Sequence, residues 1–196
     1  GIIILNIQKN WEADIRQFAS TYKAPKNNGN LLAELEVLYK TPNTHVPLVG
    51  YVDLIIENKD GSLSVIDYKS SSLYRGDALI EHARQIILYG LALEQMGYKV
   101  KSVAWMFMKY CKIKYQGYKT VKSKSKTAIE KVIERKDLGK TLAPIFEKEL
   151  EEQGWDEVDI EFLIDKMVRD NSYDIPGVDL TAVTKALDLK VIPYIL

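Results

Sequence analysis

Two aspartates and a lysine, separated by a short turn-like segment, are the residues of this 196-residue chain best suited to chemistry. They are Asp53, Asp67 and Lys69, within the stretch LVGYVDLIIENKDGSLSVIDYKSSS at residues 48–72. Carboxylates bind hard divalent cations, and an ammonium group stabilises negative charge that develops during a reaction. Together these residue types are typical of metal-assisted hydrolysis of phosphate esters.

The turn between the two aspartates decides whether their side chains meet. If residues 59–61 form a three-residue loop, with Gly61 in the left-handed conformation, Asp53 lies opposite Asp67 on the neighbouring strand. A two-residue loop would instead place Asp53 opposite Tyr68 and send the two carboxylates to different faces of the sheet. A joint site for both carboxylates therefore requires the three-residue loop.

Opposed carboxylates repel each other, so this pair needs a compensating positive charge. Directly opposed residues have Cβ atoms about 4.5–5.5 Å apart, and like charges there destabilise the strand pair. A divalent cation could compensate, and so could Lys69, which points to the same face as Asp67. Because no histidine or cysteine cluster favours zinc, Mg²⁺ or Mn²⁺ is the expected ion. The simpler alternative is an exposed ion pair on a surface hairpin, but both strands are apolar on both faces, which favours a buried site.

The elements expected to position these residues are strands followed by one long helix. Short runs rich in Val, Ile, Leu and Tyr predict strands at 31–39, 48–57 and 62–69. An apolar stripe predicts a helix from Asp77 to Met96. The other expected elements are a helix at 8–22, a strand at 100–108 paired with a basic strand at 112–121, and helices at 127–135, 142–153, 156–169 and 180–187. This order predicts an α/β fold with a mixed central sheet flanked by helices.

The charges are unevenly distributed, although the net charge is zero. Residues 99–126 carry nine lysines and no acid, interleaved with aromatic residues, whereas residues 147–174 carry eleven acids. A basic stretch with aromatics suits a phosphate backbone with stackable bases, and a solvated lysine face is an equal alternative. We expect a sheet-containing core over residues 1–124 and a small helical extension, packed on it, over residues 125–196.

Composition excludes several classes of protein. Hydrophobic residues make up 46% of the chain and charged residues 28%, as in globular domains, and no run approaches the roughly 18 apolar residues of a membrane helix. A single cysteine, Cys111, excludes a disulfide framework, a four-cysteine zinc site and a four-cysteine iron–sulfur cluster within the chain. We therefore expect an intracellular, cytoplasmic protein with no iron–sulfur cluster and no membrane partner.

Three motifs in order along the chain resemble those of the PD-(D/E)XK nuclease superfamily. They are Gly50-x-x-Asp53, Asp67-Tyr68-Lys69 and Gln85-x-x-x-Tyr89. The similarity covers residues 31 to about 110, and within the superfamily it is greatest to the RecB-like branch. That branch includes recombination exonucleases, CRISPR-associated nucleases and many phage nucleases. The resemblance implies a restriction-endonuclease-like αβββαβ core.

The resemblance also implies roles for Asp53 of the first motif and for the three residues of the second motif. Asp53, Asp67 and the backbone carbonyl of Tyr68 would hold the metal ion. Lys69 would orient or activate the attacking water. This agrees with the chemistry expected from the residue types alone.

Two further features follow from the resemblance. Gln85 and Tyr89 share one face of the predicted helix; the glutamine would bond active-site or substrate groups, and the tyrosine would contact DNA. Relatives also carry an upstream histidine or acid that completes the metal shell. For that position Glu36 is preferred here over Glu34 and Glu12.

The implied activity is that of a Mg²⁺-dependent deoxyribonuclease, with an exonuclease of DNA recombination, repair or phage DNA processing as the preferred form. Its expected partners are DNA and a larger recombination or replication complex, and a phage protein would act in the bacterial cytoplasm. Endonuclease activity and every oligomeric state stay open. The residues expected to contact DNA are Ser70, Lys109, Lys112, Lys114, Tyr115 and Lys119.

Two other functions compete with catalysis. One is a noncatalytic nucleic-acid-binding or assembly module that keeps the nuclease fold, and the other is an unrelated α/β interaction domain. The second requires three ordered motifs to be coincidence. Because Asp53, Asp67 and Lys69 are all present, the sequence favours an active nuclease over a degenerate module.

Overall fold

The computed structural model describes two compact units of the chain. The described residues are 16, 18, 19, 31–41, 43, 45–119, 123 and 125–196. We call residues 31–108 with 195–196 the sheet unit, and residues 109–194 with 16, 18 and 19 the helical unit. Glu12 and most of the helix predicted over 8–22 lie outside the described residues. The units divide between residues 108 and 109, and the domain boundary expected near residue 125 stays a prediction.

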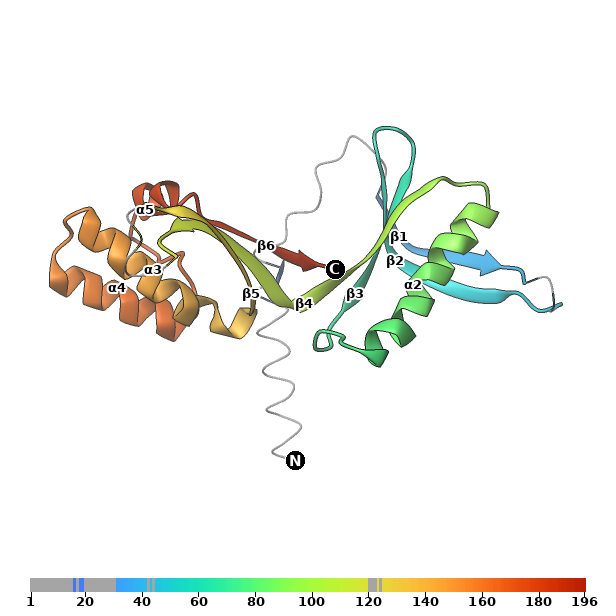
Figure 1. Ribbon diagram of the computed structural model, residues 1–196, viewed down its shortest axis with the longest axis horizontal. Coiled ribbons are helices and arrows are strands. Elements are labelled where there is room, and N and C mark those ends of the chain that lie inside the picture. Colours follow the sequence, from blue (N-terminus) through green and yellow to red (C-terminus); the bar gives the residue numbers. More distant parts are fainter. Residues whose placement is uncertain are drawn as a thin grey trace, which may run out of the picture. The chain divides into compact units, whose positions relative to one another are not determined.

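The sheet unit is built from three antiparallel strands and one crossover helix (Figure 1). Strands β1 (Leu31–Tyr39), β2 (Leu48–Glu57) and β3 (Leu63–Lys69) pair in sequence order. Helix α2 (Asp77–Gln95) then leads to β4 (Val100–Gly117), which pairs with β3 in parallel. Parallel neighbours need such a crossover connection. The strands predicted at 31–39 and 48–57, the third strand and the long helix are therefore confirmed.

The core of the sheet unit lies between α2 and the strands it covers. Its fully buried members include Val52, Ile55 and Val65 from the strands and Leu93 from α2. The strand side chains are branched at Cβ and pack well on a pleated surface, whereas Leu93 in the helix is not branched at Cβ and keeps more rotamer freedom there. Both strands of the β2–β3 hairpin thus run through a buried sheet, so the charges they carry are held in a largely apolar setting.

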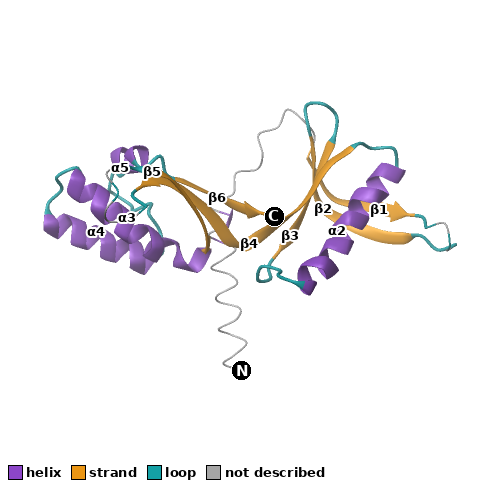
Figure 2. Ribbon diagram, in the orientation of Figure 1, coloured by secondary structure: helices purple, strands orange, loops and turns teal. Residues whose placement is uncertain are grey.

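In the helical unit β4 continues beyond residue 108 and pairs with further strands. Strand β5 (Thr127–Glu134) is antiparallel to it, and β6 (Lys190–Ile195) also pairs with it. Between β5 and β6 lie the short 3-10 helix Arg135–Asp137 and helices α3 (Leu138–Glu152), α4 (Glu157–Asp170) and α5 (Thr181–Ala186), coloured purple in Figure 2. With β1 to β6 and these helices, the described chain has the predicted mixed α/β fold.

Two predicted elements are wrong in this unit. The predicted helix at 127–135 is instead the strand β5, which ends at Glu134. Ile129 and Ile133 are four residues apart, a spacing that fits one face of a helix and also one face of a strand. They pair here with Tyr115 and Cys111 of β4. The strands predicted at 100–108 and 112–121 are one continuous strand, because residues 109–111 contain no turn-forming residue. The basic segment therefore pairs with β5 and does not fold back on 100–108.

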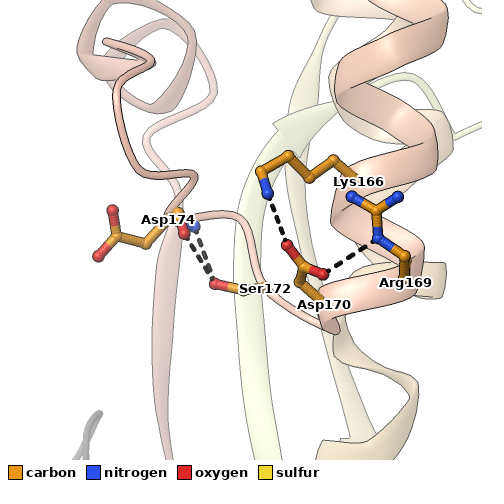
Figure 3. Close-up of polar contacts among 5 residues, drawn as sticks. All are labelled: Lys166, Arg169, Asp170, Ser172 and Asp174. Carbon is orange, nitrogen blue, oxygen red and sulfur yellow. Dashed lines mark hydrogen bonds and ion pairs between the residues drawn. The ribbon is translucent and has the colours of Figure 1, made fainter.

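The C-terminal end of α4 is held by polar contacts at the surface (Figure 3). Asp170 accepts from Lys166 Nζ at 3.0 Å and from Arg169 Nε at 3.3 Å. In the following turn the Ser172 hydroxyl accepts the Asp174 backbone N–H at 3.0 Å. The helix itself ends at Asn171, which adopts the left-handed conformation and donates its backbone N–H to the Met167 carbonyl. Among the described residues, no helix is long and apolar enough to cross a membrane.

Candidate active site

The hairpin between β2 and β3 has the predicted three-residue loop. Leu54 pairs with Ile66, and Gly61 has a φ of 76°, the left-handed conformation that such loops need. Continuing this register by one step places Asp53 opposite Asp67. The two carboxylates therefore start from adjacent strands on one face of the sheet, as the three-residue loop requires.

Asp53 is fixed by a hydrogen bond to the backbone of β3. Its Oδ2 accepts the N–H of Tyr68 at 2.7 Å. The backbone pairing of β2 with β3 ends one step earlier, at Leu54 and Ile66. The Asp53 carboxylate thus takes a backbone donor at the point where the strand ladder stops, which orients it toward β3.

Asp67 is a buried carboxylate that faces the ammonium group of Lys69. The residue is 5% exposed, and its Oδ2 lies 2.5 Å from Lys69 Nζ. This short contact is an ion pair between the Lys69 ammonium and the Asp67 carboxylate. Burial raises the pKa of the Asp67 carboxyl above its usual range, although Lys69 acts in the opposite direction. Nearby Asp53 raises this pKa further, as expected for a carboxylate pair.

A chain of polar contacts leads from Asp67 into α2. Lys69 Nζ donates to Gln85 Oε1 at 3.3 Å, and Gln85 Nε2 donates to the Tyr89 hydroxyl at 2.9 Å. Gln85 and Tyr89 are four residues apart and so lie on one helix face. The structure thus brings together the four side chains that the second and third motifs predicted.

Gly50, the first residue of the first motif, has a physical reason to lack a side chain. A Cβ atom at this position would lie 2.5 Å from Cε1 of Tyr89, well inside van der Waals contact. The ring of Tyr89 can therefore rest against the backbone of β2 only because residue 50 is glycine. The sequence identified Gly50 as part of a motif, but its partner became known from the structure.

A family model for the PD-(D/E)XK nuclease superfamily matches residues 6–172. The chain belongs to the PD-(D/E)XK nuclease superfamily. A search of curated proteins found no match. The resemblance inferred from three motifs over residues 31–110 is confirmed at the level of the superfamily, and the matched region extends through α4. The nuclease fold indicates a nucleic-acid substrate and phosphodiester hydrolysis.

An aromatic cluster beside the carboxylates was not foreseen for this nuclease. The rings of Tyr74 and His82 stack with centroids 3.9 Å apart, and Trp105 meets Tyr74 edge-on at 5.4 Å. Trp105 is the β4 partner of Asp67 in the parallel ladder and is 5% exposed. Asp67 and Trp105 are far apart in sequence, so only the pairing of β3 with β4 shows that they are neighbours.

The upstream acid of the nuclease metal shell stays a prediction. Glu36 is exposed, and its Oε2 accepts from the Tyr51 hydroxyl at 3.1 Å, a contact that raises the pKa of Tyr51. Within the described ranges, no three His, Cys, Asp or Glu side chains cluster as a ready metal site, so Glu36 does not join the two aspartates there. Glu34 lies between residues paired with Leu54 and Val52, across from Asp53, with a φ of 52°. That conformation is rare for a non-glycine residue.

The predicted DNA-contacting residues are divided between the two units. Ser70 is exposed directly after Lys69, whereas the others lie in or just after β4 in the helical unit, at Lys109, Lys112, Lys114, Tyr115 and Lys119. Lys112 and Lys114 each form an ion pair with Glu130 at 2.7 Å, and hydrogen bonds from these lysines lower the pKa of that carboxyl. The positive charge of this segment is therefore smaller than its sequence suggests. Tyr115 is 7% exposed, which leaves little of its ring for stacking.

Proposed function

We propose that this protein is a metal-dependent deoxyribonuclease that uses Mg²⁺, with Mn²⁺ able to replace it. The observation that carries the proposal is the buried Asp67 carboxylate, which lies opposite Asp53 and shares the single ammonium group of Lys69 with it as the nearby positive charge. Lys69 supplies one positive charge against the two carboxylates Asp53 and Asp67, so the buried Asp67 is only partly compensated by it. The presence of the Asp67 carboxylate beside that of Asp53 fits a divalent ion bound during catalysis.

Each residue of the site has a part in the proposed reaction. Asp53, Asp67 and the Tyr68 carbonyl would hold the ion, which when bound would polarise the scissile phosphate and lower the pKa of a coordinated water. Lys69 stabilises the negative charge that grows on the phosphate during attack. Gln85 accepts from Lys69 Nζ at 3.3 Å and so limits where that ammonium group can lie.

We further propose an exonuclease of the RecB-like branch, acting on DNA in recombination, repair or phage DNA processing, in the cytoplasm and within a larger complex. The ordered motifs from Gly50 to Tyr89 support the branch, and the superfamily match supports nuclease chemistry. Ser70 and the lysines of β4 would contact the phosphate backbone. Glu36 or Glu34 would supply the upstream acid.

The test is cleavage of end-labelled single-stranded, duplex and covalently closed circular DNA with Mg²⁺, Mn²⁺ or EDTA. Wild type is compared with Lys69→Ala and with Lys59→Ala, a control lysine exposed in the hairpin loop. Metal-dependent loss of the linear forms in wild type and Lys59→Ala, but not in Lys69→Ala, supports the exonuclease. Nicking of circles would indicate an endonuclease. Binding without any cleavage would contradict the proposal and favour a noncatalytic module.

A further inference from the structure

A groove in the sheet unit begins at two residues of the candidate active site. Its volume is about 360 Å³, and Gln85 and Tyr89 of α2 form part of its lining. The rest of the lining is aliphatic or aromatic and includes Tyr39 of β1, Val49 of β2 and Leu88 of α2. Within the described part of the chain, none of the residues that line it is charged.

The groove is preformed by contacts on both sides of it. Gly50 allows the Tyr89 ring to approach β2, and the Gln85 amide holds the Tyr89 hydroxyl at 2.9 Å. At the end of β1, the Gln95 side chain forms two hydrogen bonds with the backbone of Lys40, at 2.8 and 3.0 Å. These contacts tie α2 to both strands that border the groove. Little ordering is then needed when a ligand enters.

The lining has the chemistry of a site for a flat heteroaromatic ring. Aromatic and aliphatic walls favour a π-face, and the Gln85 amide with the tyrosine hydroxyls can hydrogen-bond the polar edge of such a ring. A phosphate group is a poor occupant because no cation lines the groove. Since Gln85 also contacts Lys69, a ring in the groove would lie next to the group that faces the scissile phosphate.

We propose that this groove binds one unstacked nucleobase of the strand being cut. The inference rests on the proposed nuclease function and extends it to the substrate. A base can enter the groove only after it leaves a duplex, and extrusion is least costly in single-stranded or already unpaired DNA. The enzyme therefore selects single strands and frayed ends over fully paired DNA.

The test compares two oligonucleotides with equal phosphate charge, dT12 and a 12-mer made wholly of abasic nucleotides. Binding is measured by fluorescence anisotropy in EDTA, so that no strand is cut. Wild type should bind dT12 about tenfold more tightly, because stacking of a single base on a protein ring contributes on this scale. Val49→Phe, which fills the groove from a residue that is 57% exposed, should reduce this ratio to about one.

Val46→Phe is the matched control, because Val46 is 75% exposed and does not line the groove. It should keep the wild-type ratio, and all three proteins should have the same melting temperature. Equal wild-type affinity for the two oligonucleotides, no binding of dT12, or an unchanged ratio in Val49→Phe would each overturn the base site.

A separate cleavage assay with Mg²⁺ distinguishes failure of the base site from failure of the proposed function. Cleavage with no preference for dT12 would leave the nuclease proposal standing and remove the base site. A preference for dT12 that depends on the groove, without any cleavage, would leave the base site standing and contradict the nuclease proposal.

Discussion

Asp67 in β3 and Asp170 at the end of α4 are both carboxylates beside a lysine, yet their surroundings shift their pKa values in opposite directions. Hydrogen bonding from Lys166 lowers the pKa of Asp170, which is exposed, whereas burial raises the pKa of Asp67 even though Lys69 Nζ lies closer to it. A lysine partner therefore does not decide the preferred state of a carboxylate. Access to water does, because desolvation penalises the charged form.

The comparison also separates residues that serve the fold from residues that serve the proposed chemistry. Asp170 has both oxygens paired and can stay ionised at little cost. Asp67 is held in an environment that disfavours its charge, which is the condition expected where a bound ion completes the site.

Removing the two carboxylates should have very different effects on cleavage. Asp67→Ala should slow DNA cleavage by at least about a hundredfold, because it removes a ligand of the proposed metal ion, and even groups that only support such ligands contribute about 10–100-fold. Asp170→Ala should cleave at the wild-type rate. The measurement is single-turnover cleavage of end-labelled DNA with Mg²⁺. Wild-type cleavage by Asp67→Ala would remove this residue from the site.

Two glycines that lie against tyrosine rings allow a second comparison between the units. A Cβ atom at Gly50 would lie 2.5 Å from Tyr89, and one at Gly117 would lie 2.6 Å from Tyr115. Gly50→Ala should slow cleavage roughly tenfold, because displacing a catalytic group by about 1 Å can cost up to about a hundredfold.

Gly117→Ala should repack the helical unit without changing the rate of cleavage. Rates and melting temperatures are measured for both variants, so that loss of folding is separated from loss of activity. Equal slowing in the two variants would mean that Tyr89 has no special part in the reaction.

Replacing the carboxyl with an amide should affect stability in opposite directions at the two sites. Asp67→Asn should raise the free energy of unfolding of the metal-free protein by about 1 kcal/mol, a typical size for a single substitution. This corresponds to a melting temperature about 2–4 °C higher. Asp170→Asn should lower the melting temperature slightly, because it removes an exposed ion pair. A lower melting temperature for Asp67→Asn in EDTA would contradict the assignment of burial as the dominant influence on Asp67.

The pH dependence of stability should also differ in sign. Asp67 has a raised pKa in the folded protein, so its contribution falls as the pH rises from about 3.9, the ordinary carboxyl value, through the folded-state pKa. Asp170 has a lowered pKa, so its contribution is present above about 3.9 and is lost as the pH falls through the folded-state value. Urea unfolding in EDTA at several acidic pH values, for wild type and the two asparagine variants, measures the contributions of Asp67 and Asp170 to the free energy of unfolding.

The sheet unit was largely predictable because local signals and tertiary structure agree there. A joint site for Asp53 and Asp67 required a three-residue loop, and the structure has that loop, with Gly61 in the left-handed conformation. Partners set by distant pairing were not predictable: the contact between Gly50 and Tyr89 depends on how α2 lies on β2, and that between Trp105 and Asp67 depends on the parallel ladder.

The helical unit was predicted less well because its signals are ambiguous. The spacing of Ile129 and Ile133 suits a helix or a strand, and pairing with β4 decides between them. The same pairing places Glu130 opposite Lys114 and within ion-pair distance of both Lys112 and Lys114, which changes the charge expected for the predicted DNA-contacting segment. A helix at 127–135 does not predict that Glu130 neutralises part of the charge of Lys112 and Lys114.

Strand β4 contributes to both units without a break, and this limits how the sequence can change in length. Successive residues of a strand face opposite sides, so a deletion of one residue at position 109 would invert every later side chain relative to the earlier ones. Cys111 and Ile113, both 0% exposed, would exchange places with Lys112 and Lys114. Insertions and deletions in related chains should therefore collect in the loops and be absent from the middle of β4.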